Sequence, residues 1–120
     1  MASKIRQSNS KTWVRNRLNT SKGADIASAT TITLGDDGNY FEVTGTTTIT
    51  YITTTNWKPG AIVVLKFGGS LTVTHNGGSP AATSAAMLLS GAANFSATAN
   101  DTLTLVYDGT TWREVARTAI

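Results

Sequence analysis

The sequence predicts a small all-β protein, a β-sandwich or jelly-roll-like barrel with an extended basic N-terminal arm. Eight or nine short apolar segments alternate with turn signals every 8–12 residues, a spacing typical of sandwiches and barrels. Threonine supplies 22 of the 120 residues, and this β-branched residue suits a pleated, half-solvated surface. Charge is also segregated: residues 1–22 carry six bases and no acid, whereas the rest of the chain carries four bases and seven acids.

These observations divide the chain into two parts. Residues 1–29 are expected to be a basic arm and linker, with the small residues of 23–29 as the linker, and residues 30–120 a β-sandwich domain. Within the arm, Trp13 and Arg17 are spaced i,i+4, which allows one or two amphipathic helical turns. A helix of that length is unstable in water by itself.

The first strands are predicted from alternating apolar residues. Residues 30–34 and 40–44 flank the turn 35–39 as a hairpin, with Phe41 and Val43 on one face. In the next strand, residues 46–55, the apolar phase changes between Ile49 and Ile52. That change indicates a bulge or a strand covered on both faces.

The nearly continuous apolar run at residues 61–67 is the best candidate for a central strand. Residues 71–75 follow it in strict alternation and predict a second hairpin. Residues 76–86 have the composition of a loop, and short strands are expected at 87–89 and 94–97.

A hairpin at residues 100–117 is expected to close the sheet. Leu103, Leu105 and Tyr107 alternate before Asp108-Gly109, and a return strand carries Trp112 and Val115. Asp-Gly between two runs of β-formers is a strong hairpin signal, because glycine accepts a positive φ without steric cost.

The search for chemistry argues against an enzyme and against any cofactor. The only histidine, His75, lies at the end of a strand without spaced partners for a metal or for catalysis. Asp36-Asp37-Gly38-Asn39 lacks the further acids of a calcium loop, so a plain turn is favoured. Asp101 and Asp108 flank one strand at positions that suit caps and turns. There is no cysteine, and neither Gly68-Gly69 nor Gly77-Gly78 fits a phosphate-binding loop.

The sequence also gives expectations about compartment. No apolar run approaches the roughly 18 residues of a membrane span, and the N-terminus lacks the apolar core of a signal peptide. We therefore expect a protein without a membrane partner that is made in a cytoplasm and is kept there or packed into something larger.

The arm is the candidate binding site, and three interpretations of its charge stay open. An acidic protein surface as its partner is favoured over a solvated tail and over nucleic acid, since no nucleic-acid motif accompanies it and the body is net negative. The candidate residues are the bases of the arm and two of its apolar groups: Lys4, Arg6, Lys11, Trp13, Arg15, Arg17, Leu18 and Lys22.

From about Ile32 to Arg117 the sequence resembles a β-rich module of tailed-phage and prophage virion proteins. The stretches that carry this resemblance are GTTTITYI at 45–52, KPGAIVVLKFGGSLTVTHNG at 58–77 and LLSGAANFSATANDTLTLVYDGTTWREVAR at 88–117. Such modules look like parts of head decoration or cement proteins, head fibres and tail fibres, frequently as homotrimers. The resemblance implies no catalytic residues and does not include residues 1–29.

The favoured hypothesis is thus a non-enzymatic capsid decoration subunit, localised to the virion and bound through its arm to the major capsid protein or other virion subunits. A tail-fibre or baseplate module that contacts host glycans through Tyr40, Tyr51 or Trp57 is the alternative within the virion. A small nucleic-acid-binding protein that acts through its arm is the alternative from a different class.

Overall fold

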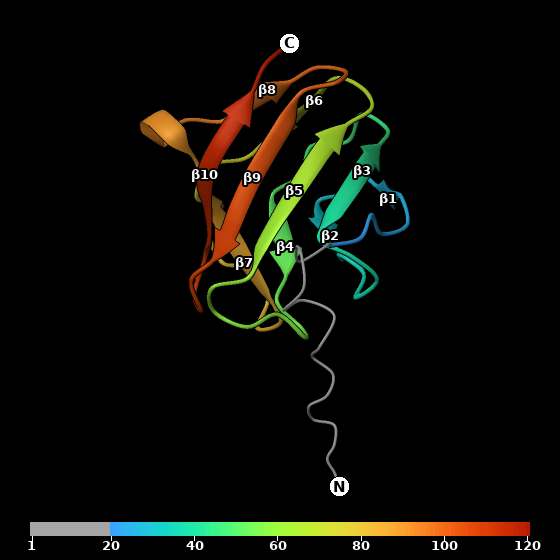
Figure 1. Cartoon of the computed structure of the whole chain (residues 1–120). Coiled ribbons are helices and arrows are strands. Elements are labelled where there is room, and N and C mark those ends of the chain that lie inside the picture. Colours follow the sequence, from blue (N-terminus) through green and yellow to red (C-terminus); the bar gives the residue numbers. More distant parts are fainter. Residues whose placement is uncertain (1–19) are drawn as a thin grey trace, which may run out of the picture.

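The structure, a computed structural model, describes residues 20–120 and confirms the predicted all-β class (Figure 1). This part of the chain contains no α-helix and one short 3₁₀ turn, η1. The elements are β1 (Ile26–Ala27), β2 (Thr31–Ile32), β3 (Tyr40–Thr44), β4 (Tyr51–Thr53), β5 (Ile62–Phe67), β6 (Leu71–Val73), β7 (Ser84–Leu88), η1 (Ser90–Ala92), β8 (Phe95–Ala97), β9 (Thr102–Tyr107) and β10 (Trp112–Thr118).

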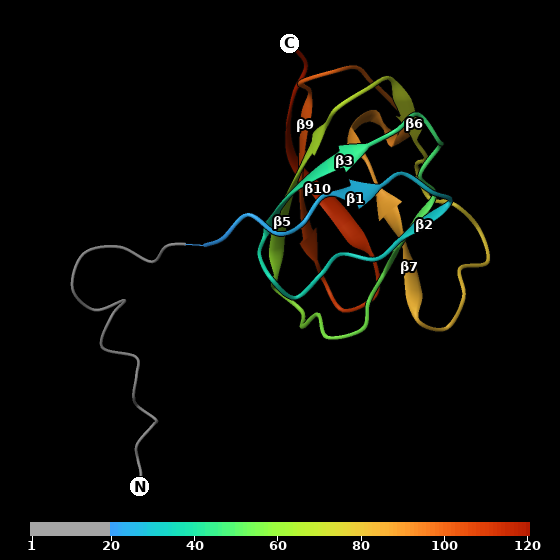
Figure 2. The same cartoon turned by 90° about the vertical axis from the view of Figure 1, so that its right-hand side faces the viewer.

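Eight strands form one curved sheet in the order β1-β3-β5-β9-β10-β7-β4-β2, and β6 and β8 form a second, two-stranded sheet. The edge strands β1 and β2 follow one another in the chain. Ala27 and Thr31 are four residues apart, so the two edges lie within about 14 Å of each other. The large sheet is therefore a nearly closed barrel, and Figure 2 shows β1 and β2 next to each other.

The barrel encloses one apolar core. Alternate residues of β3, β5 and β9 point into it, as the period of two along a strand requires. The largest side chains that are less than 2% exposed are Trp112, Phe41, Phe67, Ile32, Ile49, Ile52, Leu65, Met87, Leu103, Leu105, Val43 and Val63.

The chain winds around this core in its N-terminal half. β1, β3 and β5 are parallel neighbours on one side of the barrel, and β2 and β4 are parallel neighbours on the other. Each connection thus crosses from one side to the other instead of turning back beside its own strand. We call residues 22–67 the wound segment.

The first predicted hairpin is consequently wrong, because β2 pairs with β4 and β3 pairs with β1 and β5. The second is also wrong. β5 lies in the interior of the sheet as predicted, but its neighbours are β3 and β9, whereas β6 pairs with β8. The reason is burial: Leu71 and Val73 of β6 reach the core only from the small sheet, where Val73 pairs with Phe95.

The phase change between Ile49 and Ile52 marks a change of partner. Ile49 forms an isolated bridge with Val73 of the small sheet, whereas Ile52 pairs with β2 and β7 of the large sheet. Both isoleucines are fully buried. The predicted strand 46–55 is therefore confined to three residues, β4, and Ile49 lies in an isolated bridge outside it.

Two predicted connections contain strands. Residues 23–29 were expected to be a linker, yet β1 lies within them and pairs with Val43 and Thr44 of β3. The predicted loop 76–86 is shorter than expected, because β7 begins at Ser84. In both cases small residues pack closely against a neighbouring strand, and a composition typical of loops conceals the pairing.

The closing hairpin, residues 102–118, is confirmed. β9 and β10 are antiparallel, with Trp112 opposite Tyr107, and Leu103 and Leu105 are fully buried. Four residues, Asp108 to Thr111, connect the strands. A register shift between Glu114 and Ala116 leaves Val115 60% exposed.

Candidate functional site at the arm root

The arm joins the body through residues 20–24, which we call the arm root. The N–H of Asn39 donates to the carbonyl of Ser21 (3.0 Å), and the N–H of Gly23 donates to the carbonyl of Tyr40 (2.9 Å). The N–H of Ala24 donates to Oδ2 of Asp37 (2.8 Å). Gly23 is buried, and a Cβ there would overlap the ring of Phe41 and the carboxylate of Asp37. The arm root is therefore a fixed part of the body.

Lys22 is the one candidate binding residue of the arm that lies in the described part of the chain. Its Nζ contacts Oδ1 of Asp25 at 2.9 Å and the carbonyl oxygen of Gly23 at 3.1 Å. The hydrogen bond that Lys22 donates to the carboxylate of Asp25 raises the pKa of Lys22 above its ordinary value. The ammonium group of Lys22 is thus bound by Asp25 and Gly23 of the same chain. The other predicted residues, Lys4, Arg6, Lys11, Trp13, Arg15, Arg17 and Leu18, lie outside the described residues.

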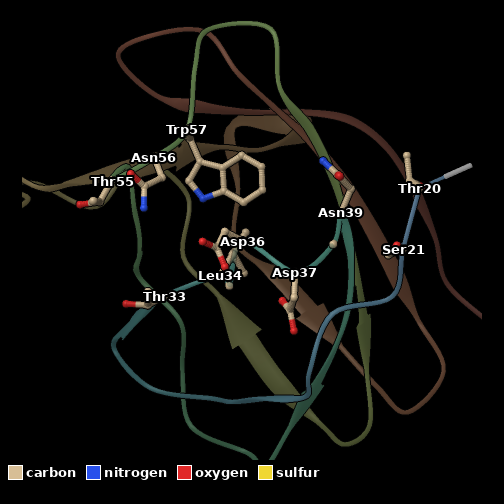
Figure 3. A pocket seen from close by; sticks show the side chains of 12 residues that line it. Thr20, Ser21, Thr33, Leu34, Asp36, Asp37, Asn39, Thr55, Asn56 and Trp57 are labelled. Carbon is tan, nitrogen blue, oxygen red and sulfur yellow. The ribbon is translucent and has the colours of Figure 1, made fainter. Parts of the chain in front are cut away.

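A cavity of about 760 Å³ opens beside the arm root (Figure 3). Three segments far apart in the sequence line it: the arm root itself, the connection from β2 to β3, and the turn from β4 to β5. The lining residues are Thr20, Ser21, Thr33, Leu34, Gly35, Asp36, Asp37, Gly38, Asn39, Thr55, Asn56 and Trp57.

Trp57 supplies the aromatic surface of this cavity. Its ring packs edge-to-face on the fully buried Trp112, with the ring centroids 5.7 Å apart. The side chain is half-buried and contacts the core, while Figure 3 shows its indole projecting into the cavity. Packing against Trp112 fixes the orientation of the ring, so the indole is a preorganised surface for a ligand.

Polar groups surround this ring. Asp37 is committed to the N–H of Ala24, and Nδ2 of Asn39 donates to the carbonyl of Ile62 (2.9 Å). Among the other polar side chains of the lining, those of Thr33, Asp36, Thr55 and Asn56 make no hydrogen bond within residues 20–120.

The lining contains two carboxylates and no lysine or arginine. An acidic cavity with an aromatic wall suits a cation, which gains from both the carboxylate and the ring face, or a polyhydroxylated ligand. It does not suit a phosphate group, because no positive charge lines it.

His75 has a structural role, as the sequence predicts. The N–H of Leu89 donates to its Nδ1 (2.9 Å). This hydrogen bond joins the chain just after β6 to the chain just after β7. Among residues 20–120, no group of three or more histidine, aspartate or glutamate side chains is arranged to hold a metal ion.

Asp101 and Asp108 act in caps and turns, again as predicted. Asp101 is buried and accepts from the N–H groups of Thr98 and Ile120, both at 2.8 Å. Asp108 accepts from the N–H groups of Thr111 (2.7 Å) and Thr110 (2.9 Å). These backbone hydrogen bonds lower the pKa of both carboxyls below the ordinary value.

The other aromatic residues named for glycan contact lie elsewhere. Tyr40 is half-buried on β3, opposite Lys22 of the arm root, and the hydroxyl of Tyr51 donates to the carbonyl of Gly78. Only Trp57 among the three lines the cavity. Sequence reasoning identified Trp57 and the turn 35–39 separately and missed that they face one another, because no local signal joins them.

Comparison with protein families, with curated proteins and with solved structures finds no match to this chain. The resemblance to phage virion modules therefore stays a prediction. In the part of the chain that the structure describes, no helix is long and apolar enough to cross a membrane.

Proposed function

We propose that this protein is a non-enzymatic structural subunit of a phage virion, a capsid decoration or cement protein that binds the outer shell through its basic arm. The observation that carries this proposal is the way in which the arm is attached. Residues 1–19, with a net charge of +5, lead into an arm root that is hydrogen-bonded to Asn39 and Tyr40 at the start of β3. Binding of the arm to another surface would therefore attach the sheet to that surface as well.

The physical role follows from this attachment. Binding to the assembled shell, but not to its free subunits, stabilises the assembled state by mass action. In the arm, Trp13, Arg15 and Arg17 are the proposed anchors, because tryptophan and arginine dominate interface energetics. An acidic surface of the major capsid protein is the proposed partner.

The homotrimer implied by the resemblance is part of the proposal. Ile62, which is 52% exposed, and Val106 are partners in register on the outward face of β5 and β9. This apolar pair supports contact between copies. Sedimentation equilibrium of the full chain tests it, and a monomer at all concentrations contradicts the trimer.

Deletion of residues 2–19 tests the attachment to the shell. The deletion ends before Thr20 because Ser21 to Gly23 belong to the sheet, so the fold is retained and its retention is checked by thermal unfolding. The truncated protein is expected to lose co-sedimentation with shells that lack the native protein. Unchanged co-sedimentation contradicts the proposal.

A matched control separates charge from length. The variant with Lys4, Arg6, Lys11, Arg15 and Arg17 all replaced by glutamine keeps the whole arm but loses five positive charges. We expect it to bind shells as poorly as the deletion does, with the wild-type affinity itself falling as salt rises. Location is tested by immunogold microscopy of virions with antibody against residues 30–120: gold on the head supports decoration, and gold on the tail contradicts it.

The cavity beside Trp57 favours a second candidate function, contact with host glycans by a tail-fibre or baseplate module. Its aromatic surface and the hydroxyl and amide groups of Thr33, Thr55 and Asn56 suit a saccharide. Saturable binding on a glycan panel, lost in Trp57→Ala and retained in Tyr51→Phe, supports this function. Absence of binding across the panel counts against it.

Nucleic acid is the third candidate, and only the charge of the arm favours it. It predicts an affinity that falls steeply with salt and disappears on deletion of residues 2–19. A gel shift with DNA and RNA at low salt tests it, and no shift removes it.

A further inference from the structure

The acidic cavity lies at the point where the basic arm joins the body. Thr20 and Ser21 form part of its wall, opposite the side lined by Asn56 and Trp57 (Figure 3). The body from residue 23 to residue 120 carries a net charge of −3, against +6 for residues 1–22. The two parts are therefore complementary in charge, and a cavity lined by two carboxylates and no positive charge lies next to the arm.

Chain connectivity keeps the end of the arm near this cavity. Arg17 precedes Thr20 by three residues, so their Cα atoms are at most about 11 Å apart in any conformation. The arginine side chain adds further reach. Arg6, by contrast, precedes Thr20 by fourteen residues and can lie up to about 50 Å away. Arg17 thus has a high effective concentration at the cavity, which Arg6 lacks.

The body already contains one arginine bound in the manner that this cavity allows. The guanidinium of Arg117 lies over the ring of Phe95, 4.0 Å from its centroid. It also donates from Nε and Nη2 to both carboxylate oxygens of Glu114, each at 2.8 Å. An aromatic face and a carboxylate together hold the cation. The cavity presents the same two groups, Trp57 and Asp36, without an arginine among its lining residues.

We propose that the cavity is a docking site for the chain's own arm, with the Arg17 guanidinium bound between the Trp57 ring and the Asp36 carboxylate. Stacking on the indole and a charge-assisted hydrogen bond to Asp36 provide the attraction. The consequence for regulation rests on the proposed function: an arm docked on its own body is withheld from the shell, so docking and shell binding compete.

The test uses NMR spectra of the full chain. The indole N–H of Trp57 and the backbone N–H of Asn56 report on the cavity, and the Nε–H of Arg17 reports on the arm. In the wild type we expect a slowly exchanging Arg17 Nε–H. Arg17→Gln is expected to shift the two cavity resonances, whereas the matched variant Arg6→Gln leaves them unchanged.

A double-mutant comparison removes the effect of mere proximity in sequence. Asp36→Asn is expected to make the Arg17 Nε–H exchange rapidly with solvent and to shift the Trp57 resonance. Adding Arg17→Gln to Asp36→Asn is then expected to change the Trp57 resonance little further. Independent, additive shifts overturn the proposal. So does a rapidly exchanging Arg17 Nε–H in the wild type at low salt.

Two other occupants are separated by the same spectra. Shifts that grow with protein concentration indicate the arm of a second copy and overturn docking within one chain. A saccharide that shifts the Trp57 resonance equally in wild type and Arg17→Gln also overturns it, because a docked arm would have to be displaced first. Since these spectra need no shell, docking can fail while shell binding through the arm persists, and the reverse.

Discussion

The closing hairpin and the wound segment build the same sheet in opposite ways. In the hairpin, β9 and β10 are neighbours in both sequence and space, and a loop of four residues joins them. In the wound segment, β3 and β5 are parallel neighbours although β4 lies between them in the chain, on the other side of the barrel. One region is specified by local signals, and the other depends on contacts across the molecule.

This difference has a consequence for folding. Contacts between residues close in sequence cost little loop-closure entropy and form early, whereas parallel pairing across a long connection forms late. The hairpin is therefore expected to form before the wound segment is laid around it. The predictions below test this difference, from the largest expected effect to the smallest.

Leu105→Ala in the hairpin and Ile32→Ala in the wound segment are a matched pair, since both side chains are buried aliphatic groups. Each is expected to lower the free energy of unfolding by about 2–5 kcal/mol. Their kinetic effects should differ: Leu105→Ala mainly slows folding, and Ile32→Ala mainly speeds unfolding. Stopped-flow measurements in urea check this. Slower folding in Ile32→Ala would contradict the expectation that the hairpin forms before the wound segment.

The ion pair between Glu114 and Arg117 lies within β10, and each of its members also contacts a residue outside the hairpin, Ser90 and Phe95 respectively. Glu114 accepts two hydrogen bonds from Arg117 and one from the N–H of Ser90 in η1 (2.8 Å). Glu114→Gln is expected to lower the free energy of unfolding by about 1.5–3 kcal/mol, the range for hydrogen bonds to a charged group. Urea titration at pH 7 measures it, and a loss equal to that of the exposed control Arg113→Gln contradicts it.

The same pair predicts a pH dependence. The hydrogen bonds from Arg117 lower the pKa of Glu114 below its ordinary value of 4.5. Because the folded pKa is depressed, the stabilisation is present above pH 4.5 and is lost as pH falls through the folded pKa. The wild type should therefore lose stability below about pH 4.5, with Asp101 and Asp108 contributing below 3.8, and Glu114→Gln should lose less over the same range.

Two glycines contrast a local with a tertiary requirement. Gly109 in the hairpin loop has a φ of 96°, so Gly109→Ala is expected to cost about 1–2 kcal/mol from its own backbone. Gly23 in the wound segment lacks space for a Cβ because of Phe41, and Gly23→Ala should cost about 1–3 kcal/mol from overpacking. Gly78→Ala, which meets open space, is the control and should change thermal stability little.

The smallest effect is expected at Lys22. Its side chain and that of Asp25 are about half exposed, and exposed ion pairs contribute little. Lys22→Gln should leave the thermal midpoint unchanged and reduce shell binding only slightly. A large loss of stability would show that the charge of Lys22, and not only the backbone of the arm root, holds the wound segment together.

The candidate site could be predicted only in pieces. The turn at 35–39 is visible in the sequence and is confirmed. Trp57 is visible there as a candidate for ligand contact, but its ring is half-buried against the core. Their proximity is not visible, because the barrel brings together connections that the chain separates by about twenty residues. The arm root shows the same limit, since the small residues of 23–29 give no sign that they pair with β3.

The sequence by itself determined the β class, the residues that point inward along β3, β5 and β9, and the hairpin at Asp108-Gly109. These features depend on the period of two along a strand and on turn chemistry, both of which act over a few residues. Only the tertiary structure decided which strands pair, how Arg117 meets Phe95, and where Trp57 faces Asp36. Many strands here share the same alternation, so local energies barely distinguish their partners, and the choice is made by burying one common core.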